Sequence, residues 1–219
     1  MVKIAPSILA ADFLHLEKDV EIVNNYADIF HLDIMDGIFV PNISFGFPVV
    51  EAIAKKATKP LDVHLMIVHP ENYVERFAKA GAAMISFHEE CVEKEGGDPG
   101  EILRFIRSLG VKSGLVINPD IPVEKLFPYL EYADYALLMS VFAGFGGQKF
   151  IEGTYSKIKD LKAEIDRRGL NCPIEIDGGV SPANSKQLIE AGAEILVAGS
   201  SVFHAENPEA AIKLMREVK

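Results

Sequence analysis

Residues 31–37 read His-Leu-Asp-Ile-Met-Asp-Gly, an apolar strand pattern that runs into a loop. Side chains of a strand alternate between its two faces, so His31 and Asp33 share one face and Leu32 lies on the other. An imidazole and a carboxylate on an apolar strand need partners, because burying them unpaired is costly. Metal ligation and a structural ion pair both meet that need, and this stretch alone does not choose between them.

The composition limits the classes of protein to which the chain can belong. It has 219 residues, 49% of them hydrophobic, and a net charge of −10, which argues against nucleic acid and anionic membranes as partners. Its two cysteines, Cys91 and Cys172, form no CxxC pair. No apolar run reaches membrane-helix length, and the first residues lack a signal-peptide pattern. We therefore expect a cytoplasmic protein without membrane contact.

Short apolar runs alternate with amphipathic patterns along the chain. We expect strands at residues 3–9, 29–34, 61–67, 84–88, 112–117, 135–141, 174–177 and 194–198. We expect helices at residues 13–25 with Asp12 as N-cap, 47–57, 70–80, 122–130, 154–168, 182–191 and 208–218, and one that ends at residue 109 after a loop over 89–100. Eight such strand–helix units predict an α/β protein, a (β/α)₈ TIM barrel that forms a single domain over residues 1–219.

Polar residues stand at the ends of several predicted strands, where barrels of this kind carry their sites. Two imidazoles and two carboxylates converge from three strands: His31, Asp33, His64 and Asp177. This set suits Zn²⁺, Fe²⁺, Mn²⁺ or Co²⁺, among which the residue types alone do not choose, and we expect one divalent ion per subunit. A buried hydrogen-bond network without metal is the alternative. Glu175 shares a face with Asp177, so one of them can lie deeper in the barrel.

Glycine-bearing loops follow the sixth, seventh and eighth strands, at residues 144–148, 178–179 and 199–201. Backbone N–H groups in such loops can hold a phosphate, and barrel enzymes often place that site after the last two strands. An acidic protein can thus bind an anionic substrate through amides and a metal. Glycine in such a turn also has purely geometric reasons, so each loop alone is a weak signal.

Two carboxylates beside one divalent ion suggest acid–base chemistry. If Asp33 and Asp177 lie on opposite sides of a bound carbon, one can remove a proton and the other can return one to the opposite face. That reaction is epimerisation next to a carbonyl, through an enediolate. Met35, Met66 and Met139 stand near strand ends. Packing explains them, and a dry, polarizable wall around the substrate is the sharper hypothesis.

Five stretches together carry a resemblance: IAPSILAAD at residues 4–12, HLDIMDGIFVPN at 31–42, DVHLM at 62–66, GFGGQKF at 144–150 and EIDGGV at 175–180. They resemble the ribulose-phosphate 3-epimerase family over nearly the whole chain. The family implies a ribulose-phosphate-binding (β/α)₈ barrel that interconverts D-ribulose 5-phosphate and D-xylulose 5-phosphate, and it suggests a homo-oligomer.

The resemblance also implies roles for single residues. Asp33 and Asp177 correspond to the acid–base pair, and together with His31 and His64 they correspond to the metal ligands. Ser7 and His64 correspond to residues that contact the sugar. The residues that correspond to the phosphate side are Gly144, Phe145, Gly146, Gly147, Gly178, Gly179, Gly199 and Ser200.

One departure concerns the loop before residue 144, where the family usually has Asn-Pro and this chain has Phe142 and Ala143. Loss of a proline should loosen this loop, which can act as a lid. The departure keeps a D-allulose-6-phosphate 3-epimerase as the alternative, although the Gly178-Gly179 pair favours the pentose enzyme.

Other functions on this fold fit less well. A Schiff-base aldolase needs a lysine in the site, whereas Lys3 and Lys112 stand at strand starts. A related decarboxylase needs a lysine where Ile34 or Met35 stands. A sugar-phosphate binder would not need two carboxylates at a metal.

Overall fold

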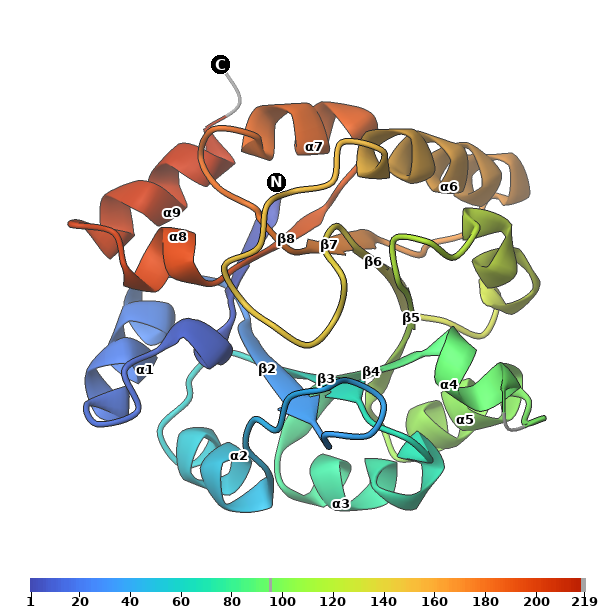
Figure 1. Cartoon of the computed structure of the whole chain (residues 1–219), viewed down its shortest axis with the longest axis horizontal. Helices are drawn as coiled ribbons and strands as arrows, with labels where there is room; N and C mark the ends of the chain where they lie inside the picture. The colour runs from blue at the N-terminus through green and yellow to red at the C-terminus, as the bar shows by residue number, and fades with distance from the viewer. Residues whose placement is uncertain (95, 218–219) are drawn as a thin grey trace.

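The computed structural model describes residues 1–94 and 96–217. It contains one parallel eight-stranded sheet in the order β1-β8-β7-β6-β5-β4-β3-β2, which Figure 1 shows curled into a barrel. The strands are β1 (Lys3–Pro6), β2 (Phe30–Met35), β3 (Leu61–Met66), β4 (Ala82–His88), β5 (Lys112–Ile117), β6 (Tyr135–Met139), β7 (Ile174–Asp177) and β8 (Ile195–Ala198). The predicted (β/α)₈ barrel is confirmed.

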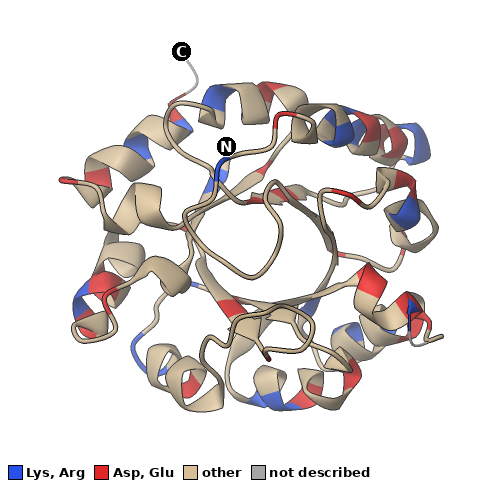
Figure 2. Cartoon of the chain, viewed as in Figure 1, with Lys and Arg blue, Asp and Glu red and all other residues tan. Residues whose placement is uncertain are grey.

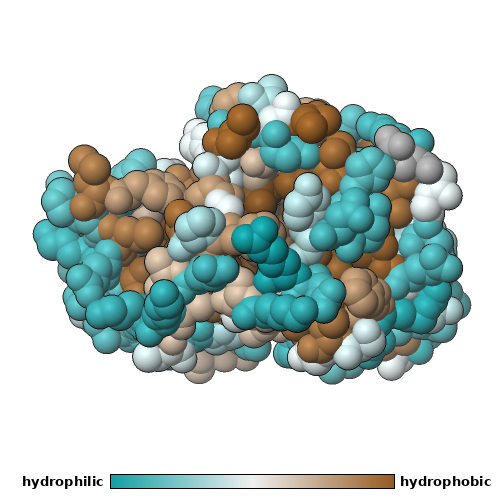
Figure 3. Space-filling model, turned by 90° about the horizontal axis from the view of Figure 1, so that it is seen from below, coloured by the Kyte–Doolittle hydropathy of each residue, from teal (hydrophilic) through white to brown (hydrophobic). Residues whose placement is uncertain are grey.

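Helices surround the sheet as an outer ring (Figure 1). The α-helices are α1 (Leu16–Tyr26), α2 (Phe47–Ala54), α3 (Val74–Lys79), α4 (Glu89–Glu93), α5 (Pro99–Ser108), α6 (Thr154–Arg168), α7 (Ser185–Ala191), α8 (Ser200–Phe203) and α9 (Pro208–Arg216). Three 3₁₀ segments accompany them, η1 (Ile8–Ala10), η2 (Pro70–Asn72) and η3 (Val123–Tyr129). Charged residues lie mainly on this ring (Figure 2), and hydrophilic residues are spread over the face covered by α2 and α3 (Figure 3).

The barrel closes between β1 and β2, where a single parallel bridge joins Ser7 to His31. At the other end of this seam the Asp28 carboxylate accepts a hydrogen bond from the Ile4 amide at 2.8 Å. At the bridge, the Ser7 hydroxyl donates a hydrogen bond of 2.5 Å to Asp33 Oδ2. The seam therefore depends on polar side chains at both ends, and one of those ends is the predicted site.

Alternate side chains of the strands enter two different apolar clusters. Leu32 and Ile34 of β2 belong to the large cluster that also includes Val20 of α1 and Val50 of α2. A smaller cluster contains Ala5, Ile29, Met84, Tyr135, Ile195 and Val197. The first packs the sheet against its helices, as expected for strands covered on their outer face.

Several predicted element bounds were wrong, for local reasons. The first long helix begins at Leu16 instead of residue 13, because Asp12 accepts the Leu14 amide in a turn and does not cap the helix. The segment predicted as a loop at 89–100 contains α4 and the start of α5, and the short α8 was missed. The segment at 122–130 is the 3₁₀ segment η3, which contains Pro128. Residue 218 of the predicted last helix lies outside the described residues.

Within the described part of the chain, no helix combines the length and apolar character needed to cross a membrane.

Gly114 provides a test of packing inside the barrel. A Cβ at this position would lie 2.4 Å from Cζ of Tyr135, whose ring is buried and whose hydroxyl donates to Asp62 at 2.6 Å. Because the ring is held at both ends, we expect Gly114→Ala to destabilise the fold by about 1–3 kcal/mol, as overpacking does.

The matched control is Gly153→Ala, at a residue with φ −58° and no atom near the added Cβ. This change should be neutral or stabilise by about 0.4–1 kcal/mol. Urea unfolding of both variants measures the difference. Equal midpoints would contradict the packing that we describe.

Candidate active site

The register of β2 and β3 brings four polar residues together in two adjacent pairs. His31 is opposite Asp62, and Asp33 is opposite His64. All four side chains are buried. Since His-x-Asp on one strand meets Asp-x-His on the next, each imidazole has a carboxylate neighbour both along its own strand and across to the other strand.

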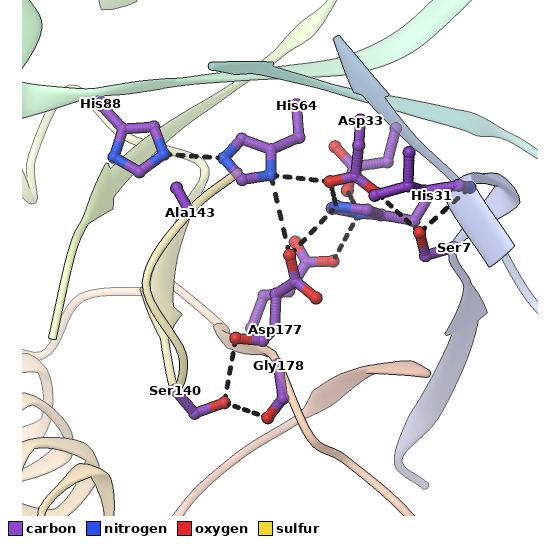
Figure 4. A network of polar contacts seen from close by, with 12 residues as sticks. Ser7, His31, Asp33, His64, His88, Ser140, Ala143, Asp177 and Gly178 are labelled. Atoms are coloured by element: carbon purple, nitrogen blue, oxygen red, sulfur yellow. Dashed lines mark hydrogen bonds and ion pairs between the residues drawn. The ribbon is translucent and has the colours of Figure 1, made fainter. Parts of the chain in front are cut away.

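His31 and Asp33 of β2, His64 of β3 and Asp177 at the end of β7 point toward one another (Figure 4). His31 Nε2 lies 3.4 Å from Asp33 Oδ1 and 3.8 Å from Asp177 Oδ2. His64 Nδ1 lies 3.3 Å from Asp33 Oδ1 and 3.8 Å from Asp177 Oδ2. The structure thus brings together the four residues that the sequence analysis selected as metal ligands.

Two observations fit these four residues to a divalent metal. His31 Nε2 and His64 Nδ1 are buried and have no hydrogen-bond partner among the described residues, although both face carboxylate oxygens. In addition, ligands about 2.0–2.1 Å from a tetrahedral zinc ion lie about 3.4 Å apart, close to the four separations of 3.3–3.8 Å found here. A cation between them would satisfy both nitrogens.

The two aspartates have opposite electrostatic environments. Burial opposes ionisation of Asp33, but the neighbouring His31 and His64 outweigh it and hold the pKa of this carboxyl well below its ordinary value. Burial and the negative charge of Asp33 raise the pKa of Asp177 to about 7. Burial also lowers the pKa of His64 to about 4, so its imidazole is neutral. Carboxyl groups with pKa values shifted in opposite directions are typical of acid–base pairs.

Three further buried residues, Asp62, Tyr135 and Glu175, lie beside these four. His31 Nδ1 is 2.8 Å from Asp62 Oδ2, and Tyr135 donates to the other oxygen of Asp62 at 2.6 Å. Glu175 is fully buried, with one oxygen 3.6 Å from His31 Nδ1, and burial together with the charge of Asp62 raises its pKa to about 8. Glu175 is therefore deeper than the partly exposed Asp177.

A cavity of about 350 Å³ opens above this cluster. Asp33 and Asp177 line it, as do Met35, Met66 and Met139, while His31 and His64 are fully buried below its surface. Most of the residues predicted to bind substrate also line it: Ser7, Gly144, Phe145, Gly146, Gly147, Gly178, Gly179, Gly199 and Ser200. The predicted site residues are thus brought to one cavity, and His64 reaches it only from beneath.

Comparison with known proteins relates this geometry to a family. The ribulose-phosphate 3 epimerase family matches residues 3–203. The chain belongs to the ribulose-phosphate 3-epimerase family. It is 49% identical to the ribulose-phosphate 3-epimerase of a Synechocystis species, with 99% of this chain and 94% of that one aligned. It is 43% identical to the Bacillus subtilis enzyme of the same name over the whole of both chains.

Membership of this epimerase family makes the protein an isomerase and confirms the resemblance found in its sequence. More distant solved structures share its fold alone. A KGPDC from Streptococcus mutans has a TM-score of 0.73 at 13% identity and covers 99% of this chain and 96% of its own. A 3-hexulose-6-phosphate synthase has a TM-score of 0.67 at 19% identity, with 98% of each chain covered.

The glycines after β7 have packing reasons of their own in this epimerase. A Cβ on Gly178 would lie 2.4 Å from Cγ2 of Val141, and one on Gly179 would lie 2.6 Å from the Phe150 amide nitrogen. Both residues have positive φ, +120° and +63°. The loops after β6 and β7 can approach this closely only with glycine there, so the pair is required by geometry whatever else it binds.

Above the cavity, hydrogen bonds join the loop after β2 to the loop after β6 and also hold the latter loop internally. Asn42, in the loop after β2, donates its side-chain amide to the Gly144 carbonyl at 2.9 Å. Gln148 donates to the carbonyls of Phe142 and Phe145. Phe142 itself is 51% exposed at the rim of the cavity. Side-chain amides therefore hold the loop in which Phe142 and Ala143 stand in place of the family's Asn-Pro. That the loss of the proline loosens this loop stays a prediction.

The sequence analysis missed some residues that the site depends on. Asp62 holds His31 and is itself held by Tyr135, and nothing in the local sequence marks Tyr135 for this role. Asp62 could have been found, because it shares a strand face with His64 in the same way that His31 does with Asp33. Ser140, directly after β6, donates to the carbonyls of Asp177 and Gly178 and so supports the backbone of the site.

Proposed function

We propose that the protein interconverts D-ribulose 5-phosphate and D-xylulose 5-phosphate by inverting C3. The observation that carries this proposal is the pair Asp33 and Asp177 at the floor of one cavity, with pKa values moved in opposite directions. Inversion next to a carbonyl needs one group to take a proton from one face of the carbon and another to return a proton to the opposite face. Relatives that carry the name of this activity support the choice of substrate.

In this proposal Asp33 and Asp177 exchange the C3 proton with the substrate. Ser7 holds one oxygen of Asp33 at 2.5 Å and leaves the other turned toward His31 and His64. The three methionines would keep water from the reacting carbon, since thioether side chains are apolar and polarizable. The cavity walls therefore protect the carbanion-like centre while the two carboxylates move protons.

His31, Asp33, His64 and Asp177 would hold one divalent ion per subunit. When bound, such an ion supplies positive charge that stabilises negative charge developing on the substrate oxygens. Zn²⁺ is our first candidate, with Fe²⁺, Mn²⁺ and Co²⁺ as alternatives, because two imidazoles and two carboxylates suit all four. A homo-oligomer in the cytoplasm, without nucleic acid, stays a prediction from the sequence.

The phosphate would bind to backbone amides of the loops at 144–148, 178–181 and 199–201. Among the described residues that line the cavity, the charged ones are Asp33 and Asp177, and none is lysine or arginine. An anionic group entering this cavity therefore depends on N–H groups and the metal for its stabilisation. The carboxylates and the amide-rich loops lie in the same cavity, so a sugar phosphate can reach both.

The reaction can be tested by proton NMR of D-ribulose 5-phosphate in D₂O with the metal-supplied protein. We expect xylulose 5-phosphate that carries deuterium at C3, because solvent protons exchange on the carboxylates. D-Allulose 6-phosphate, assayed in parallel, decides between the pentulose and the hexulose substrate. Faster conversion of the hexulose phosphate would overturn our assignment.

The two-carboxylate mechanism predicts separate half-reactions. Asp33→Asn and Asp177→Asn should each lower epimerisation by about 10²–10⁴-fold, the usual contribution of a positioned acid or base. Each variant should still exchange the C3 hydrogen of one of the two epimers, because the remaining carboxylate serves one face. Metal content is measured for both variants. Exchange of both epimers by a metal-loaded variant would contradict the assignment.

The metal site predicts that chelation abolishes turnover and that one equivalent of divalent ion per chain restores it. His31→Asn and His64→Asn should each lower the metal content, because each removes an unpaired imidazole nitrogen. His69→Asn is the matched control, since His69 is an exposed loop residue with φ 51°, a conformation that asparagine tolerates. Full activity of the chelated protein would contradict the proposal.

A further inference from the structure

Buried side chains continue from His64 away from the other metal ligands. His64 Nε2 lies 3.0 Å from Nε2 of His88, at the end of β4, and the two ring planes differ by 20° (Figure 4). Both imidazoles are fully buried. A hydrogen bond between two ring nitrogens requires one to donate and the other to accept, so the proton on one ring determines the proton on the other.

Glu90 lies at the far end of this chain. Its Oε1 is 3.1 Å from His88 Nδ1 and also accepts from Asn118, at 3.1 Å from the backbone amide and 2.7 Å from the side-chain amide. Burial opposes ionisation of Glu90, but the hydrogen bonds from His88 and Asn118 outweigh it and lower the pKa of this carboxyl. Glu90 is therefore a carboxylate, which accepts hydrogen bonds and cannot donate one.

The proton positions follow from Glu90. Because a carboxylate accepts only, His88 must donate from Nδ1. A His88 ring that carries this one proton has a lone pair on Nε2, the atom that faces His64. That lone pair accepts the proton on His64 Nε2. His64 is then left with a lone pair on Nδ1, the atom that faces Asp33 and Asp177 without a hydrogen-bond partner.

We propose that Glu90 is a positioning residue that acts through His88 to hold His64 in the one tautomer able to bind the metal. The inference rests on the metal site of the proposed function and extends it by two residues. His31, the other imidazole of the proposed metal site, is oriented by a carboxylate directly. Its Nδ1 lies 2.8 Å from Asp62, and its Nε2 faces the site. Carboxylates thus orient both imidazoles, one directly and one through a second histidine.

Asn118 joins the Glu90 carboxylate to the loop over the cavity. Its Oδ1 accepts the Ala143 amide at 3.0 Å, while its side-chain nitrogen donates to Glu90. The amide group of Asn118 therefore has its two ends fixed by different elements, which holds the Glu90 oxygen in place for His88. His88 ends β4, Glu90 lies in α4 and Asn118 follows β5. Substitutions at these three positions therefore need not touch substrate.

The experiment measures Zn²⁺ affinity by competition with a chromophoric chelator, without substrate. Glu90→Gln keeps the shape and one acceptor and should weaken binding by about 10-fold, whereas Glu90→Leu removes the acceptor and should weaken it by about 100-fold, the range for outer-shell partners. Glu89→Gln is the matched control. Glu89 is a buried neighbour 3.9 Å from Lys125, outside the His88 contacts, so its substitution should leave the affinity unchanged.

Nitrogen-15 NMR of the metal-free protein gives a second readout, which a merely structural role would not move. In the wild type the His64 proton should be on Nε2, and in Glu90→Leu it should shift toward Nδ1. If Glu90→Leu does not fold, Glu90→Gln decides through its affinity. Wild-type affinity and tautomer in a folded Glu90 variant would overturn the inference, as would an equal loss in Glu89→Gln. Absence of Zn²⁺ binding by the wild type would instead overturn the metal site itself.

Discussion

The parallel register between β2 and β3 is the constraint on which the site depends. It sets His31 against Asp62 and Asp33 against His64 inside an apolar barrel. Unpaired, each of these groups would cost several kcal/mol to bury, or would change its protonation state to avoid the cost. A slip of β2 by one residue would turn His31 and Asp33 to the helix-facing side of the sheet and its apolar side chains into the barrel, so the site and the apolar packing specify the same register.

The end of the barrel that carries the candidate site also contains the bridge between β1 and β2 that helps to close the barrel. Ser7, just after β1, bridges to His31 through the backbone and holds Asp33 through its hydroxyl, so one residue contributes both to closure and to the candidate site. Below it, Tyr135 fills the space that Gly114 leaves and holds Asp62 in turn. Fold stability and ligand orientation are therefore coupled, because the same hydrogen bonds contribute to both.

An acidic protein that binds a sugar phosphate has to concentrate positive character locally. Figure 2 shows the lysines and arginines mainly on the outer helices, away from the barrel centre. The cavity combines two carboxylates with amide-bearing loops, and two unpaired imidazole nitrogens lie below it. The proposed divalent cation would reconcile these features, since it would compensate the carboxylates and attract substrate oxygens, while backbone N–H groups would attract the phosphate without adding net charge.

The sequence by itself determined the fold class and the four central residues that we propose as metal ligands. Strand and helix periodicities are local, and His31, Asp33, His64 and Asp177 each stand in or directly after an apolar run, where a polar residue is conspicuous. Helix starts such as Leu16 and the short α4 depended on turn chemistry that periodicity does not carry. Only the tertiary structure decided which nitrogen of each imidazole faces the site. That choice depends on Asp62 and, through His88, on Glu90, residues from other elements that only strand register and packing bring within hydrogen-bond distance.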